Sequence, residues 1–150
     1  MSSIEHLKAS GFFQGFKDEH IEKISKLCQE EICQPQDVII KEGEEAKNLY
    51  ILTGGVVAIQ IQLKKYQDVI VSTIEKKGEL FGWSALVEPK CYTASVKCLE
   101  KTKVLSICGE ELEKLFEDDP VMGLAFMQKI ASLIDNRLIT MRKRLISSIS

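Results

Sequence analysis

The sequence is poor in histidine and in arginine. Its only two histidines, His6 and His20, lie near the N-terminus, and no arginine precedes Arg137. A metal site built on several histidines, or a nucleophile activated by histidine, therefore cannot be assembled from the residues after His20. These absences make an enzyme the less favoured interpretation of the chain.

The five cysteines lack the spacing of a structural or redox motif. They stand at positions 28, 33, 91, 98 and 108, an odd set without a Cys-x-x-Cys pair. Secreted disulfide scaffolds and zinc sites use paired or regularly spaced cysteines, and iron–sulfur sites need clustered ones. The sequence therefore predicts reduced, buried thiols and no metal site.

Long apolar runs and a strong charge of one sign are also missing. A helix that spans a bilayer needs about 20 apolar residues, and residues 1–5 do not begin a basic segment followed by an apolar one, as a signal peptide would. We therefore expect no membrane contact and a cytoplasmic location. The net charge of −2 and the isoelectric point of about 5.8 argue against a general nucleic-acid surface.

What the chain does contain is the composition of a globular domain. Its 150 residues are 45% hydrophobic and 28% charged, which is close to the average and long enough for a buried core. We expect a single domain over residues 1–150 that is mainly β with flanking helices. Its parts would be a helical start over 1–30, a β-roll over 31–108 and C-terminal helices over 110–147.

The middle region alternates short runs of β-branched residues with turns that carry glycine or charge. Such spacing predicts a barrel or sandwich of short strands, here a jelly roll. Six strands can be recognised from the pattern, at residues 38–40, 49–52, 56–61, 69–71, 94–96 and 104–107.

The C-terminal region predicts a short helix over residues 110–117 and a long helix from Pro120 to about Ser147. Asp118-Asp119-Pro120 supplies a helix cap and a proline in the first turn. Phe126, Ile130 and Leu133 line one face of the long helix, and this face can pack on the barrel.

A second apolar stripe on the long helix repeats at spacings of 4 and 3 residues, as in coiled coils. A small domain leaves nothing to cover this stripe, so we expect a homodimer that pairs the long helices. The alternative, a helix that folds back wholly on its own barrel, stays open. The stripe consists of Met127, Ala131, Ile134, Leu138, Met141 and Leu145.

Residues 78–95, GELFGWSALVEPKCYTAS, hold the strongest motif. The two glycines four positions apart, the Ser-Ala-Leu and the Thr-Ala-Ser resemble the phosphate-binding cassette of the cyclic-nucleotide-binding domain. Residues 40–44, 49–57 and 118–120 add further motifs of that family in the same order. The chain resembles the sensor half of the catabolite-activator-type regulators over nearly its whole length. The resemblance implies an eight-stranded jelly-roll barrel with N-terminal helices and a long C-terminal dimerisation helix.

The resemblance also implies a ligand site in residues 78–95, hereafter the cassette, with two positions changed. Trp83 stands where the family usually has a glutamate for the ribose hydroxyl, and Tyr92 where it usually has an arginine for the cyclic phosphate. Charge-assisted hydrogen bonds contribute about 1.5–3 kcal/mol each, so both losses lower the affinity by roughly 10²–10⁴. Cyclic AMP is therefore not expected to bind tightly.

The remaining ligand contacts that the resemblance implies come from backbone and short side chains. The backbone N–H groups of Ser84 and Ala85 would face an anion, with the Thr93 hydroxyl nearby. Lys90 is close enough in sequence to substitute in part for the missing arginine. The full set of implied ligand-binding residues is Gly82, Trp83, Ser84, Ala85, Lys90, Tyr92, Thr93 and Ala94.

Three states of the site stay open at this point. The rings of Trp83 and Tyr92 can fill the pocket themselves, they can stack on a modified or non-nucleotide ligand, or the site can retain a cyclic nucleotide. No cofactor other than a cyclic nucleotide or another small ligand is expected.

The function classes follow from these states. A small-molecule sensor or regulatory domain is the first, and a ligand-free dimeric module that regulates a protein partner is the second. A third is the sensor half of a transcription regulator without its DNA-binding domain. Direct DNA binding by this chain is not expected, because the basic run Arg142-Lys143-Arg144 suits a solvated helix end. A cupin-type metalloenzyme is disfavoured because the β region has no histidine.

Overall fold

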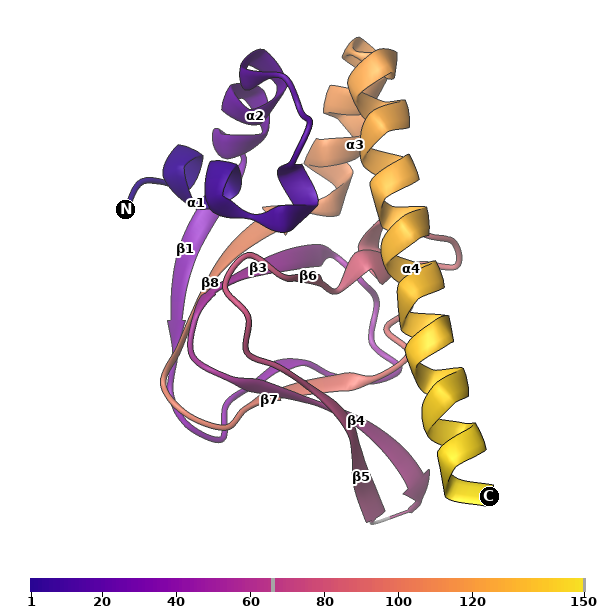
Figure 1. Cartoon of the computed structure of the whole chain (residues 1–150). Coiled ribbons are helices and arrows are strands. Elements are labelled where there is room, and N and C mark those ends of the chain that lie inside the picture. Colours follow the sequence, from indigo (N-terminus) through magenta and orange to yellow (C-terminus); the bar gives the residue numbers. More distant parts are fainter. Residues whose placement is uncertain (66, 150) are drawn as a thin grey trace. The chain divides into compact units, whose positions relative to one another are not determined.

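The structure is a computed structural model that describes residues 1–65 and 67–149 (Figure 1). The chain divides into two compact units, Met1–Lys114 and Leu115–Ser150. The first unit holds the N-terminal helices and every strand, and the second holds most of the C-terminal helical region. The two units are described separately. The prediction that residues 1–150 form a single domain stays a prediction.

The first unit contains a jelly roll of two antiparallel four-stranded sheets, as expected (Figure 1). The first sheet has the order β1 (Cys28–Cys33), β8 (Thr102–Cys108), β3 (Asn48–Gly54) and β6 (Leu80–Phe81). The second has the order β2 (Val38–Ile40), β7 (Ser95–Cys98), β4 (Val57–Lys64) and β5 (Gln67–Ile74).

The apolar core of the roll is built mainly from the central strands. Ile51 of β3 and Leu105 of β8 lie opposite each other in the first sheet, and both are fully buried. In the second sheet β4 begins with the buried Val57 and Ala58 but ends with exposed residues, so the far end of the β4–β5 hairpin extends out of the core (Figure 1). Burial on one face of each sheet is what holds the strand register.

All six strands recognised from the sequence are confirmed, with ends that differ by a few residues. The pattern missed β1 and β6. β1 reads Cys-Gln-Glu-Glu-Ile-Cys and exposes four of its six residues, because it is an edge strand. β6 has only two residues, too few to show any alternation.

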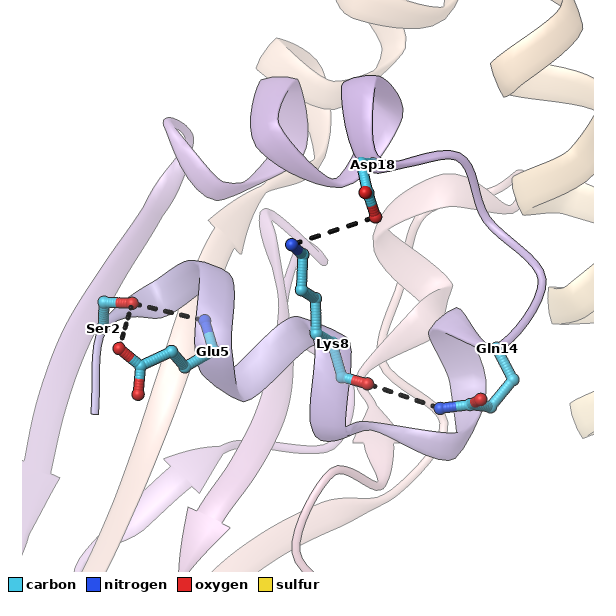
Figure 2. Close-up of polar contacts among 5 residues, drawn as sticks. All are labelled: Ser2, Glu5, Lys8, Gln14 and Asp18. Atoms are coloured by element: carbon cyan, nitrogen blue, oxygen red, sulfur yellow. Dashed lines mark hydrogen bonds and ion pairs between the residues drawn. The ribbon is translucent and has the colours of Figure 1, made fainter.

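The N-terminal region contains α1 (Ser3–Ala9), the short 3₁₀ helix η1 (Gly11–Phe13) and α2 (Asp18–Ser25). The Ser2 hydroxyl caps α1 by accepting from the Glu5 N–H at 3.3 Å (Figure 2). Gln14 donates from Nε2 to the Lys8 carbonyl at 3.3 Å, and Lys8 and Asp18 form an ion pair at 3.8 Å (Figure 2). The helical start ends earlier than the predicted residue 30, because β1 already begins at Cys28.

The two C-terminal helices agree with the sequence analysis. They are α3 (Gly109–Asp118) and α4 (Pro120–Ile149), and the Met122 N–H donates to the Asp119 carboxylate at 3.2 Å, as expected of a cap. Within the second unit the rings of Phe116 and Phe126 lie 5.2 Å apart. A side chain at Gly123 would meet Phe116 Cβ at 2.8 Å, so the glycine that weakens the helix is needed for this approach.

The apolar faces of α4 differ in exposure. Phe126 and Ile130 of the first face are buried and Leu133 is half-buried, whereas the second stripe becomes more exposed toward its end, up to Leu145 at 62%. Among the described residues, no helix is long and apolar enough to cross a membrane.

Candidate functional site

The cassette begins at a turn that only glycine can form. Gly78 has a φ of +93°, and a Cβ there would lie 2.8 Å from the Cα of Ser10. The Ser10 hydroxyl donates to the Gly78 carbonyl at 2.6 Å, and the Gly78 N–H donates to the Leu52 carbonyl at 2.7 Å. The start of the cassette is thus tied to the N-terminal helices on one side and to β3 on the other.

The second glycine positions the short helix that follows it. Gly82 has a φ of +79° and is the N-cap residue of the 3₁₀ helix η2 (Trp83–Leu86). A Cβ at Gly82 would come within 3.1 Å of the Ile40 side chain and 3.2 Å of the Asn48 carbonyl oxygen. This close approach brings the cassette backbone against the segment between β2 and β3.

The helix η2 uses part of the backbone that the sequence assigned to a ligand. The Ala85 N–H donates to the Gly82 carbonyl at 3.2 Å inside the turn. Ala85 is buried against Gly109, where a side chain would lie 2.8 Å from the Ala85 carbonyl oxygen. Trp83 and Ser84 are half-buried. Of the two predicted anion donors, Ala85 therefore already has a partner within the protein.

Lys90 is directed to α3. Its Nζ lies 2.7 Å from the Glu113 carboxylate and 4.0 Å from that of Glu88. The hydrogen bond to Glu113 raises the pKa of Lys90, and the charges of Glu113 and Glu88 act in the same direction. The ammonium is therefore neutralised by the protein's own carboxylates in this structure.

Tyr92 is bound to the backbone of Asn48 through its hydroxyl. The hydroxyl donates to the Asn48 carbonyl at 2.5 Å and accepts from the Asn48 N–H at 3.2 Å. Only 9% of Tyr92 is exposed. Burial raises the pKa of the phenol, and the Asn48 backbone contacts oppose this rise. The side chain at the position of the family's arginine is thus fixed as a structural cross-link.

The backbone around Tyr92 extends the same connection. The Tyr92 N–H donates to the Glu44 carbonyl at 3.0 Å, and its carbonyl accepts from the Gly43 N–H at 2.9 Å. Ser95 accepts from the Glu42 N–H at 2.9 Å. Thr93 between them is exposed, and Ala94 is half-buried. The second half of the cassette is therefore hydrogen-bonded through Tyr92 and Ser95 to residues 42–44, which precede β3.

An aromatic cluster stands beside this connection. The rings of Tyr50 and Phe81 stack at 5.4 Å with planes 17° apart. Burial raises the pKa of Tyr50 to about 12, and the neighbouring Tyr92 adds to the rise. Tyr50 also limits the space at Gly82, where a Cβ would lie 3.3 Å from its ring.

The structure brings together some of the predicted site residues and separates others. Gly82 and Tyr92 meet at Asn48, whereas Lys90 faces Glu113. The sequence analysis missed Asn48 and Glu113, because Asn48 acts through its backbone and Glu113 lies on α3 outside every motif. Ligand binding by the eight residues stays a prediction.

Comparison with known families gives a match over most of the roll. Residues 30–119 match the family described as the cyclic nucleotide-binding domain. Among curated proteins, a cGMP-dependent protein kinase of Eimeria tenella is 27% identical over 111 residues, which cover 74% of this chain and 10% of the kinase. The chain spans about a tenth of the length of the first curated relatives it matches.

Solved structures agree. A protein from Geobacter metallireducens GS-15, assigned as a cyclic nucleotide-binding protein, has a TM-score of 0.80 and 29% identity, with 92% of this chain and 99% of that one covered. The catabolite activator protein of Thermus thermophilus has a TM-score of 0.75 and 22% identity, with 91% and 62% covered, and supports the fold alone.

Proposed function

This chain belongs to the cyclic nucleotide-binding domain family, and on that premise we propose that it is a small-molecule sensor or regulatory domain that does not bind cyclic AMP tightly. The proposed role is regulatory rather than catalytic. The cytoplasmic location expected from the sequence stays a prediction.

The observation that supports the proposal is that the Tyr92 hydroxyl and the Lys90 ammonium, the two groups nearest to the missing charges, are already bound to other residues of the protein. The Tyr92 hydroxyl makes two hydrogen bonds to Asn48, and the Lys90 ammonium lies 2.7 Å from Glu113. A cyclic phosphate would have to replace one of these interactions before it gained a contact with Tyr92 or Lys90. A ligand anion that displaces an existing ion pair gains little net free energy.

The first half of the cassette supports retention of some regulatory role. Gly82 and η2 keep the backbone form that the family resemblance implied, and Trp83 at the ribose position is half-buried. The large ring offers a surface on which a planar group can stack. A titration with cyclic nucleotides separates weak binding of a nucleotide from the other two states, which are self-filling of the pocket and a non-nucleotide ligand.

The test uses Trp83, the only tryptophan of the chain. Cyclic AMP and cyclic GMP are titrated separately into the protein, with tryptophan emission and calorimetry as readouts. We expect no saturable change below roughly 100 µM, because two charge-assisted contacts are missing. An isotherm with a dissociation constant near or below about 1 µM for either nucleotide contradicts the proposal.

A second candidate role, a dimeric interaction module, is favoured by the exposure of α4. Leu138 is 57% exposed, Met141 42% and Leu145 62%, although all three belong to the predicted coiled-coil stripe. Met127 and Ile134 are half-buried, and Ala131 is exposed. A partner helix would cover these side chains, and a second copy of the chain is the occupant we propose.

Sedimentation tests the dimer. We expect the wild type to be a dimer and Leu138→Glu to be a monomer with a folded roll, since the substitution would bury an unpaired charge against the partner helix. Ile139→Glu is the matched control, because Ile139 is also exposed but lies off the stripe. A wild type that is monomeric at tens of micromolar contradicts this assignment.

A further inference from the structure

Two thiols from different sheets of the roll meet in the structure. Cys33 is the last residue of β1 in the first sheet, and Cys98 is the last residue of β7 in the second. The two side chains lie near enough for each to affect the pKa of the other. The two cysteines are 65 positions apart in the sequence, so their spacing does not predict that they are neighbours in the fold.

The backbone holds the pair from both sides. The Gln36 N–H donates to the Cys98 carbonyl at 2.8 Å, and the Cys98 N–H donates to the Asp37 carbonyl at 2.8 Å. The turn that follows Cys33 therefore closes around Cys98. On the other side Cys33 lies opposite Thr102 in the β1–β8 ladder, and Thr102 follows Cys98 by four positions in the sequence.

The remaining thiols have different surroundings. Cys28 donates to the Ile24 carbonyl at 3.6 Å, and Cys91 donates to the Tyr92 carbonyl at 3.9 Å. In the described part of the chain, residues 1–65 and 67–149, Cys33 and Cys98 are the thiols that affect each other's pKa. Both are free thiols in this structure.

We propose that Cys33 and Cys98 are a redox modification site, at which a low-molecular-weight disulfide such as glutathione disulfide forms a reversible bond between the two sheets. Cys33 is half-buried and can be reached from solvent, whereas Cys98 is fully buried and acts second. The site is independent of the cassette and of any nucleotide.

The chemistry takes two exchange steps. The Cys33 thiolate attacks one sulfur of glutathione disulfide, which forms a mixed disulfide and releases one glutathione thiolate. The Cys98 thiolate then attacks the Cys33 sulfur, so that the mixed disulfide breaks, the Cys33–Cys98 bond forms and the second glutathione leaves. The protein loses two electrons and two protons, and the two glutathione molecules gain them.

The environment predicts a slow reaction at neutral pH. Burial raises the pKa of the Cys33 thiol to about 11, and the neighbouring Cys98, Glu31 and Asp37 add to the rise. Burial also raises the pKa of Cys98, although the Thr102 side chain opposes it. Because the thiolate is the nucleophile, the initial rate should rise about tenfold for each pH unit between pH 7 and 9.

The experiment incubates the intact reduced chain with glutathione disulfide, blocks the remaining thiols with iodoacetamide and digests with trypsin. Mass spectrometry should find peptide 27–41 joined to peptide 98–101, at a mass lower by two hydrogens, and dithiothreitol should release both. Peptide 27–41 also contains Cys28, so the Cys28→Ser variant is run in parallel and should give the same linked pair. The linked protein should melt about 5–15 °C higher, since the bond closes a long loop in the unfolded chain.

Two results overturn the proposal. One is a glutathione adduct that stays on Cys33 at equilibrium without passing to Cys98. The other is a disulfide that forms mainly through Cys28, Cys91 or Cys108. Both are measured on the wild-type chain, and the Cys28→Ser variant separates Cys28 from Cys33 within peptide 27–41. Cys98→Ser adds a positive control, since it should retain the Cys33 adduct that the wild type resolves.

Discussion

The two halves of the cassette follow different rules. Residues 78–86 are shaped by backbone geometry: Gly78 and Gly82 adopt left-handed conformations at points where any side chain would collide. Residues 88–95 are held by side chains, through Lys90 to Glu113 and through Tyr92 to Asn48. The first half is thus determined by backbone geometry, while the side chains of the second half are bound to other residues of the protein.

The contrast separates the determinants of the fold from those of the ligand. Glycines at tight turns are demanded by the roll itself, so they are retained whether or not a ligand binds. The residue before Thr93 is not required by the roll in this way. Tyr92 at this position makes two hydrogen bonds within the protein in place of a ligand contact. Four experiments test whether the two halves are as independent as this comparison suggests.

The largest effect is expected in the first half, for Gly78→Ala. The left-handed φ and the 2.8 Å approach to the Ser10 backbone should together cost about 2–4 kcal/mol of the free energy of unfolding. Urea denaturation measures this loss. Gly43→Ala is the control, because Gly43 has a φ of +88° but no atom within 4 Å of the added Cβ, and we expect about 1–2 kcal/mol there. Equal losses at the two sites would show that the contact with Ser10 contributes nothing.

Restoring both charges should come next in size. Trp83→Glu with Tyr92→Arg returns a ribose acceptor and a phosphate fork to a backbone that still has Gly82 and η2. We expect cyclic AMP affinity to rise by about 10²-fold over the wild type, as two charge-assisted contacts would allow. Calorimetry measures it, and each single variant should gain little. A folded double variant without binding means that the pocket differs from the family's at further positions.

Tyr92→Phe should have a smaller effect on stability. It removes only the hydroxyl and leaves the N–H and carbonyl of Asn48 without their side-chain partner, which should lower the free energy of unfolding by about 1–2 kcal/mol. Thr93→Val, at the exposed neighbouring position, is the control and should change stability by less than about 0.5 kcal/mol. If Tyr92→Phe is as stable as the wild type, the cross-link to Asn48 is not structural.

The smallest effect should come from the ion pair between the cassette and α3. Lys90→Met and Glu113→Gln should each lower the melting temperature slightly, and the difference from the wild type should shrink at about 0.5 M NaCl because salt screens exposed charges. The pKa of Lys90 is raised in the folded protein, so its contribution is complete below its unfolded pKa and is lost as pH rises through the folded value. Combining the two variants should add nothing further, since either one removes the pair; additive losses would contradict a direct interaction.

The sequence predicted the fold where local rules decide it. The long helix α4 was recognisable from its cap at Asp119 and its apolar periodicity, and the structure places the cap bond at Met122 as expected. β1 could not be recognised, because this edge strand with exposed glutamates has no alternation and only one β-branched residue, Ile32. Its existence depends on pairing with β8, 69 to 79 positions away.

The candidate site, like the fold, was predictable only where residues close together in the sequence determine it. Gly82 and the short helix after it follow from residues that are neighbours in the chain. The fate of Tyr92 and Lys90 does not, since their partners Asn48 and Glu113 lie 44 and 23 positions away. Whether a side chain faces a ligand or the protein is decided by these distant partners, and a motif contains no information about them.

The strand order of the two sheets affects how the chain can fold during its synthesis on the ribosome. All six strand pairings join a member of the first half, β1–β4, to a member of the second half, β5–β8. Among the described strands, only the β4–β5 pairing joins consecutive strands. Strands β1–β4 therefore cannot complete their pairing until β7 and β8 have emerged from the ribosome, and their apolar faces stay exposed until then. Such closure of long loops slows folding, so we expect the nascent chain to depend on chaperones until about residue 108 has left the exit tunnel.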